Sequence, residues 1–161
     1  MRLERVISDL PAGFDVLRAE ARAEDYRHVD RLADEWRAGT MRFDRQGEAL
    51  IAAHLGGDLP GLGGLTIDPS QPGALRMRRF YVRASFRRAG IGRAIAEKLL
   101  AHARAFGRPV TVNAAAGSEP FWRSLGFVLD ARNGHTHVFE LAERLRLQDH
   151  KIAQLVRYTP R

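Results

Sequence analysis

The chain has 161 residues, of which 45% are hydrophobic, so we expect one domain with a buried core and no second domain. It contains no cysteine, which excludes disulfides, thiolate metal sites and a cysteine nucleophile. The sequence has no apolar run of about 18 residues, and residues 1–5 do not resemble a targeting signal, so we expect a cytoplasmic protein with no membrane partner.

The formal net charge of +7 comes from one segment of the chain. Seven of the 26 basic residues are arginines between Ala74 and Ala96, where no acidic residue occurs, and the other 19 equal the 19 acidic residues in number. A local positive field fits a polyanionic small molecule at least as well as a nucleic acid. Because the chain has neither a pattern of stacking aromatics nor a helix-turn-helix signature, we do not expect a nucleic-acid partner.

The first quarter of the chain predicts an arm, a strand and a helix. Residues 1–13 have few periodic apolar positions, so we expect an N-terminal arm. Residues 14–20 alternate loosely between apolar and polar, which predicts the first strand. Between residues 23 and 38, apolar or aromatic residues recur at steps of three and four, which predicts an amphipathic helix that Gly39 ends.

A hairpin and a central strand are predicted next. Two mainly apolar runs, residues 49–55 and 62–67, flank the turn Gly56-Gly57-Asp58. Residues 75–82 then alternate as the central strand. One face would carry Leu75, Met77, Arg79 and Tyr81, and the other Arg76, Arg78, Phe80 and Val82. Such mixed faces suit a buried strand only where something polar lies against them.

The segment after the central strand has the composition of an anion-binding loop. Gly90 and Gly92 precede the amphipathic pattern of residues 91–106, which predicts a helix that Gly107 ends. Without Cβ atoms at these positions, consecutive backbone N–H groups of the first turn can converge on an anion. Three arginines add positive charge: Arg87, Arg88 and Arg93. This chemistry predicts pyrophosphate binding.

Two other phosphate-binding motifs also contain glycines, but the sequence departs from both. A Walker P-loop needs Lys-Ser or Lys-Thr after its last glycine, and here Arg93-Ala94 follows Gly92. A dinucleotide fingerprint needs a third glycine and an acidic residue near the end of the next strand, where Asn113 stands. The remaining alternative is a strand-to-helix turn that binds nothing.

The C-terminal third predicts a strand, a helix and a hairpin. Residues 109–114 should form a strand parallel to the central strand, since a crossover helix joins the two. Ser118 can cap a short helix that ends at Gly126, and Asn133-Gly134 predicts a tight hairpin turn. Residues 142–158 are charged and loosely helical, and could pack on the domain, on a second subunit in a homodimer, or on nothing.

A metal site is not expected in this region. His135 and His137 share one face of the last predicted strand. Two histidines with no third ligand make a poor metal site, so we predict no metal.

From about Leu75 to Phe127 the sequence resembles the GNAT N-acyltransferases. The spacing Arg87-x-x-Gly90-x-Gly92 after a strand is similar to their acetyl-CoA motif, and residues 119–127 resemble their Phe-Tyr-x-x-x-Gly-Phe segment. The resemblance implies an α/β (α+β) fold, with one mixed, mostly antiparallel twisted sheet, flanking helices and a splayed central strand pair. It implies a single domain over residues 1–141, with a helical extension over residues 142–161.

Acetyl-CoA is the cosubstrate that this resemblance implies, without a metal. In the family, a backbone N–H near the end of the central strand binds the thioester carbonyl, and an asparagine on the next strand contacts the pantetheine arm. The cofactor-binding residues carried over are Phe80, Tyr81, Val82, Arg87, Arg88, Ala89, Gly90, Ile91, Gly92, Arg93 and Asn113. For Asn113, the alternative is an asparagine that only ends a strand.

The implied reaction is direct transfer of an acetyl or other acyl group from acetyl-CoA to a primary amine of a small molecule or a protein. The catalytic residues stay unassigned, because Arg76 stands where many members have a glutamate base and Trp122 where many have a tyrosine acid. A water chain to Asp44, Glu48 or His54 is one route for the amine proton. The alternative function is a non-catalytic acyl-CoA-binding regulatory or sensor protein.

Two sets of residues are candidates for contact with the acceptor. The segment after the first helix walls the acceptor site in the family, so Met41, Phe43 and Asp44 are candidates, with a loop that covers the core as the alternative. If Arg76 faces the site, it favours an amine that also carries a carboxylate or phosphate. In the alternative, Arg76 pairs with Asp68 and never meets the substrate.

Overall fold

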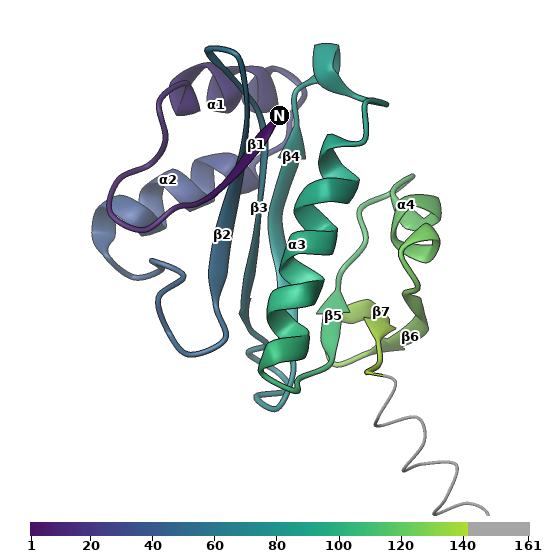
Figure 1. The fold of residues 1–161 in the computed structure, drawn as a ribbon. Helices are drawn as coiled ribbons and strands as arrows, with labels where there is room; N and C mark the ends of the chain where they lie inside the picture. The colour runs from purple at the N-terminus through teal and green to yellow at the C-terminus, as the bar shows by residue number, and fades with distance from the viewer. Residues whose placement is uncertain (142–161) are drawn as a thin grey trace, which may run out of the picture.

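In the computed structural model, which describes residues 1–141, seven strands form one open sheet with helices on both faces (Figure 1). The sheet order is β1-β2-β3-β4-β5-β7-β6, with β4 and β5 parallel and the other neighbours antiparallel. The strands are β1 (Arg2–Arg5), β2 (Ala49–Leu55), β3 (Asp58–Ile67), β4 (Leu75–Val82), β5 (Val110–Val112), β6 (Val128–Arg132) and β7 (His135–Phe139). The predicted single α/β domain with a mixed, mostly antiparallel sheet is confirmed. The extension predicted for residues 142–161 lies outside the described residues.

The sheet divides the core into two halves, which helices cover. The helices are α1 (Phe14–Ala23), α2 (His28–Ala38), α3 (Ile91–Ala105) and α4 (Glu119–Ser124). Helices α1 and α2 cover one face of the sheet and α3 the other, while α4 lies near the β6–β7 hairpin (Figure 1). None of these four helices, all within residues 1–141, has the length and apolarity to cross a membrane.

The prediction of a strand over residues 14–20 is wrong, because these residues belong to helix α1. Its buried residues Phe14, Leu17 and Ala21 are spaced by three and four, which places them on one helical face. Val16 suggested alternation, but it is 51% exposed on the outer face. The predicted arm also contains regular structure, since residues 2–5 form the edge strand β1 and pair with β2.

The helix predicted between residues 23 and 38 is interrupted by an elbow, residues 24–27, that joins α1 to α2. Asp25 has a φ of 59°, in the left-handed region that a continuous helix excludes. The spacing of apolar residues in the sequence predicted one helix across this break, because the apolar residues of α2 recur at helical intervals by themselves. Gly39 ends α2 in the left-handed conformation, as predicted.

The predicted strand pairings are confirmed. Strands β2 and β3 form the hairpin, although β3 begins at Asp58, inside the predicted turn. Strands β6 and β7 meet at Asn133-Gly134, where both residues have positive φ, as a type I′ turn requires. Strand β5 runs parallel to β4 after the crossover helix α3, which ends before Gly107.

The central strands β4 and β5 part after a short parallel ladder. They pair from Leu75 with Val110 to Met77 with Val112. Strand β5 then ends while β4 continues to Val82, so the edge of β4 that faces β5 has no strand partner over its last residues. The predicted splayed pair is therefore present.

The predicted alternation of side chains along β4 is wrong at the end of the strand, because the strand contains a bulge. Arg79 has a φ of 59°, and the register between β3 and β4 shifts beside it. Met77 and Phe80 consequently pack on the α3 side, whereas Tyr81 packs with the α1–α2 core. The extra residue reverses the faces that the sequence predicts for the end of the strand.

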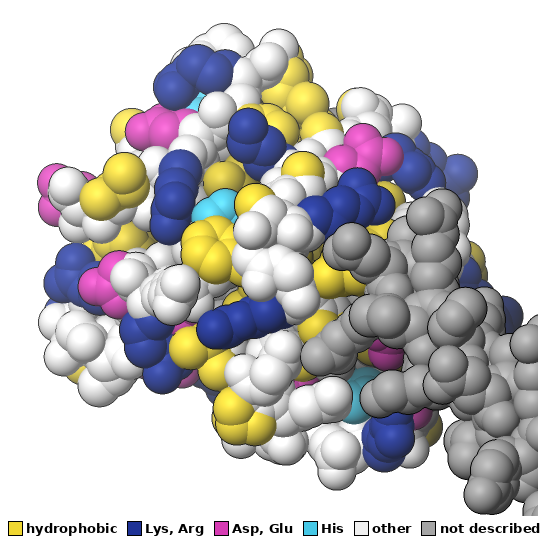
Figure 2. Space-filling model, turned by 60° about the horizontal axis from the view of Figure 1, so that its bottom comes forward, with side chains coloured by type: hydrophobic (Ala, Val, Ile, Leu, Met, Phe, Trp, Pro, Cys, Tyr) yellow, Lys and Arg dark blue, Asp and Glu magenta, His cyan; other side chains and the backbone are white. Residues whose placement is uncertain are grey.

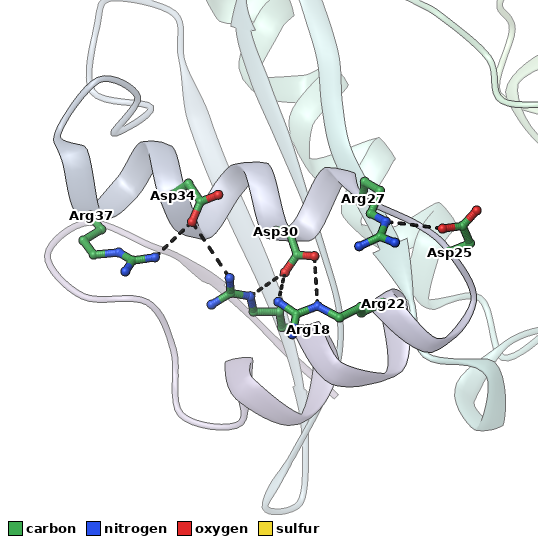
Figure 3. Close-up of polar contacts among 7 residues, drawn as sticks. All are labelled: Arg18, Arg22, Asp25, Arg27, Asp30, Asp34 and Arg37. Atoms are coloured by element: carbon green, nitrogen blue, oxygen red, sulfur yellow. Dashed lines mark hydrogen bonds and ion pairs between the residues drawn. The ribbon is translucent and has the colours of Figure 1, made fainter.

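Ion pairs between α1 and α2 supplement their apolar contact (Figure 3). Asp30 accepts hydrogen bonds of 2.6 Å from both Arg18 and Arg22. Asp34 accepts from Arg37 within the same helix, at 2.9 Å. On the face drawn in Figure 2, basic side chains are separated by polar, apolar and acidic groups rather than joined in one continuous patch.

The Asp30 cluster predicts an acid-sensitive contribution to stability. Hydrogen bonds from Arg22 and Arg18 hold the pKa of the Asp30 carboxyl well below its ordinary value. A pKa lowered by folding adds stability above the unfolded value of about 4, and this is lost as the pH falls toward the folded value. We expect Asp30→Asn to lower the urea midpoint at pH 7, and the deficit relative to the parent to shrink below about pH 4.

The matched control is Asp25→Asn, which removes a single exposed pair with Arg27. It should leave the midpoint nearly unchanged. An Asp30→Asn deficit that stays constant from pH 7 to pH 3 would contradict the assignment.

Candidate active site

A cavity of about 980 Å³ lies where β4 and β5 part. Its walls come from four segments within residues 24–31, 76–82, 86–93 and 112–122. They contribute the elbow and the start of α2, all but the first residue of β4, the loop before α3, and the chain from β5 to α4. Residues far apart in the sequence therefore meet because the parallel ladder ends early.

The glycine loop, residues 87–93, presents unpaired backbone donors to this cavity. Gly90 has a φ of 78°, and a Cβ built there would meet nothing within 4 Å. The first helical hydrogen bond of α3 runs from the Ala94 N–H to the Gly90 carbonyl. The N–H groups of Ile91, Gly92 and Arg93 precede it and have no partner inside the helix. This is the geometry of an anion-binding helix terminus.

The three arginines of the glycine loop have different surroundings. Arg87 donates to the Val82 carbonyl at 2.9 Å and to Glu24 at 2.8 Å. Arg93 donates to Ser124 and pairs with Glu97 along α3. Arg88 is exposed and makes no side-chain hydrogen bond or ion pair within residues 1–141. The charge available to a ligand at this end is therefore mainly that of Arg88.

The elbow holds the end of β4 in place. The Tyr26 hydroxyl donates to the Phe80 carbonyl, and the Tyr81 hydroxyl donates to Glu24 at 2.7 Å. Burial raises the pKa of Tyr26 to about 12, and burial also raises the pKa of Tyr81. Hydrogen bonds from Tyr81 and Arg87 lower the pKa of Glu24. At neutral pH both phenols therefore stay protonated and Glu24 stays ionised.

His28, the first residue of α2, lies in a positive environment. Its ring packs edge-on against Tyr26, with 4.9 Å between the centroids. Partial burial lowers the pKa of His28, and the nearby charges of Arg79, Arg31 and Arg78 lower it further. The imidazole is therefore neutral at pH 7.

Arg76 lines the cavity but is held by neighbouring strands and turns. It pairs with the fully buried Asp68 at 3.1 Å and donates to the Asn133 carbonyl at the same distance. The Thr111 hydroxyl joins the group by donating to Asp68 at 2.7 Å. The structure thus has the Arg76–Asp68 pair of the alternative prediction.

An aromatic wall closes the α4 side of the cavity. Trp122 is buried and packs edge-on against Phe80, with 5.1 Å between the ring centroids. Phe121 packs against Trp122 in the same way, at 4.9 Å. These contacts fix the width of the opening between β4 and α4.

The residues predicted to bind the cofactor come together here, since all of them except Ala89 line the cavity. The three candidate proton acceptors do not line it. Glu48 is buried and paired with Arg45, and His54 pairs with Glu4 at 2.9 Å. Neither Met41, Phe43 nor Asp44 lines it, and Phe43 is buried in the α1–α2 core, as the alternative of a covering loop requires.

Sequence reasoning missed the elbow residues Glu24 and Tyr26 and the first residue of α2, His28. Reading one continuous helix placed Tyr26 on its apolar face. Tyr26 lies three residues before Val29, so the helical spacing did not reveal the break.

Comparisons with known proteins agree with this geometry. Residues 18–140 match the model of the acetyltransferase (GNAT) domain family. A putative acetyltransferase from Exiguobacterium sp. 255-15 is 25% identical with a TM-score of 0.79, over 92% of this chain and 97% of its own. No match occurs among curated proteins.

Two further solved structures share the fold. A GNAT family acetyltransferase from Brucella melitensis, in complex with acetyl-CoA, is 16% identical with a TM-score of 0.60, over 88% of this chain and 89% of its own. The N-acetyltransferase YhbS from Escherichia coli, in complex with CoA, is 17% identical with a TM-score of 0.62, over 89% of this chain and 84% of its own.

Proposed function

This chain belongs to the GNAT acetyltransferase family, and from that premise we propose that it transfers an acetyl group from acetyl-CoA directly to a primary amine of a small molecule or a protein. The observation that carries the proposal is a single cavity that joins unpaired helix-terminal N–H groups to the free edge of β4. The domain that does this work is residues 1–141.

The residues present fit acetyl-CoA. The N–H groups of residues 91–93 and the guanidinium of Arg88 would hold the pyrophosphate, and Asn113 would contact the pantetheine arm. The structural relatives from Brucella melitensis and Escherichia coli, solved with acetyl-CoA and CoA, support this assignment. Acetyl-CoA would supply the thioester that donates the acetyl group. A backbone N–H within residues 80–82 would stabilise charge on its carbonyl oxygen.

Transfer also requires a neutral amine and a group that takes its proton. Among the described residues that line the cavity, Glu24 and His28 have side chains that can accept a proton near neutral pH. Glu24 already accepts hydrogen bonds from Tyr81 and Arg87. We therefore assign proton acceptance to His28, whose lowered pKa leaves it neutral. Trp122 has no acidic proton to give, so solvent would protonate the departing thiolate.

The competing function is a regulatory or sensor protein that binds acyl-CoA without turnover. The absence of a carboxylate at position 76 and of a phenol at position 122 favours it. The neutral imidazole in the cavity favours the transferase.

Turnover separates the two functions. The full chain, incubated with acetyl-CoA and a panel of primary amines, is expected to release free CoA thiol together with an acetylated amine. Because the protein has no cysteine, a thiol reagent reads only CoA. Saturable acetyl-CoA binding with no thiol release on any amine or on peptide amines would favour the sensor.

The glycine loop is tested by Gly90→Glu. The new side chain would enter the space above Gly90 and bring a negative charge to the proposed pyrophosphate position, so calorimetry should show loss of CoA binding by at least about 100-fold. Gly39→Glu is the matched control, because Gly39 also has a left-handed φ, 71°, and open space around it but lies outside the cavity lining. If CoA affinity is unchanged in a folded Gly90→Glu protein, the loop does not hold the cofactor.

The role of His28 predicts a pH dependence. The lowered pKa means that the proton-accepting form of His28 persists below the ordinary imidazole pKa of about 6.5, and activity should fall as the pH decreases through the lowered pKa. His28→Gln should reduce kcat about 100-fold and remove this acidic limb. The control His54→Gln, outside the cavity, should keep both the rate and the limb. An unchanged acidic limb in His28→Gln would assign the proton to another group.

A further inference from the structure

Most arginines that line the cavity have an acidic partner, but Arg31, Arg78 and Arg88 have none among residues 1–141. The acids near Arg78 are Glu35 and Asp68, and each is bound elsewhere: Glu35 to Arg79 at 2.7 Å and Asp68 to Arg76 at 3.1 Å. Within residues 1–141, the side chain of Arg78 makes no hydrogen bond and no ion pair. A half-buried guanidinium in this state leaves its donors available to a ligand.

Arg31 adds a second guanidinium from the other wall of the cavity. It lies one turn along α2 from His28, is exposed, and makes no side-chain hydrogen bond or ion pair in the described part of the chain. His28 lines the same cavity as Arg31, Arg78 and Arg79, whose charges lower its pKa. The only carboxylate that lines the cavity within residues 1–141 is Glu24, and Arg87 neutralises it.

These charges lie on the sheet face opposite the helix that carries the glycine loop. Arg78 pairs with Gly64 across the β3–β4 ladder. A Cβ on Gly64 would meet Phe43 at 2.4 Å, and Phe43 belongs to the core under α1 and α2. Residues in register share a face, so Arg78 projects on the α1–α2 side, whereas α3 covers the other side. A pyrophosphate at the glycine loop therefore accounts for Arg88 but not for Arg78 and Arg31.

We propose that Arg78 and Arg31 bind an oxyanion on the acceptor, so that the acceptor is an amine that also carries a carboxylate or a phosphate. The inference rests on the proposed acetyl transfer and specifies its substrate class. Guanidinium groups bind both oxyanions through paired N–H donors, and an acceptor held between Arg78 and Arg31 lies beside the neutral imidazole of His28. A polyamine would bring positive charge to a wall that lacks a free carboxylate.

This assignment moves the anion contact away from Arg76. Its guanidinium is held by Asp68, Thr111 and the Asn133 carbonyl, and that network joins β4, β5 and the β6–β7 turn. Arg78 stands two residues further along the same face and has no such partners among residues 1–141.

The first experiment measures binding and does not require turnover. The full chain, saturated with CoA, is titrated by calorimetry with N-acetyl amino acids and with the matching N-acetyl amino acid amides, which differ only in the carboxylate. A second pair, O-phosphorylethanolamine and ethanolamine, tests the phosphate. At least one anionic member is expected to bind 10-fold or more tightly than its neutral partner, and the pair that does so identifies the oxyanion.

Variants then assign the preference to residues. Arg78→Gln should abolish the 10-fold difference by weakening the anionic ligand alone, and Arg31→Gln should reduce it. Arg37→Gln is the control, because it also removes one arginine charge from α2, the helix that carries Arg31, but Arg37 lies outside the cavity lining. Circular dichroism and retained CoA affinity establish that each variant is folded. In turnover, Arg78→Gln should raise the KM of the anionic amine and leave that of acetyl-CoA unchanged.

The results distinguish this inference from the proposed function. If amines are acetylated but neutral or cationic amines are preferred, the inference is overturned and the transferase stands. If no amine is acetylated but the anionic ligands bind through Arg78, the transferase fails and the anion site stands. If neither pair shows a difference between its members, or if Arg78→Gln leaves the difference intact, the anion site is refuted.

Discussion

The site depends on one constraint, the early end of the parallel ladder between β4 and β5. A strand edge inside a protein normally pairs with its neighbour, because unpaired N–H and C=O groups are costly to bury. Here β5 stops at Val112, and a cavity rather than another strand faces the rest of β4. The bulge at Arg79 belongs to the same arrangement, since it reverses the side chains that follow it. The cavity is thus a consequence of the sheet topology. The side chains of its walls give it its charge.

Charge is distributed on these walls by acids that lie next to them. Glu24, Glu35 and Asp68 each neutralise one arginine that lines the cavity, and each also ties two elements together. The arginines without an acidic partner in the described part of the chain lie at separate ends of the cavity, Arg88 by the glycine loop, and Arg78 and Arg31 on the opposite side of the sheet. The basic segment that stands out in the sequence therefore contains two kinds of arginine in the folded protein. Some pair with acids and hold the structure together, and others can bind a ligand.

Much of this could be predicted from the sequence, because the signals were local. The glycine loop, the crossover helix and the Asn133-Gly134 turn depend on residues that are adjacent in the chain, and each lies where it was predicted. Helix α1 was not predicted, because Val16 suggested the alternating pattern of a strand. The side-chain faces at the end of β4 were predicted wrongly, because the left-handed residue Arg79 adds one residue to the strand and reverses the alternation after it. Ion partners such as Asp68 and Arg76 depend on register between strands, so the sequence left them as alternatives.

The elbow between α1 and α2 has a consequence for how such a protein can diversify. Its residues reach the cavity through side chains, while the flanking helices are anchored independently by their apolar stripes and by Asp30. Exchanging residues 24–28 therefore alters the chemistry of one wall and the hydrogen bonds that hold the end of β4, and leaves the buried apolar faces of α1 and α2 in place. A short connection of this kind is a modular unit, through which one scaffold can acquire new selectivity by a few substitutions and without a new fold.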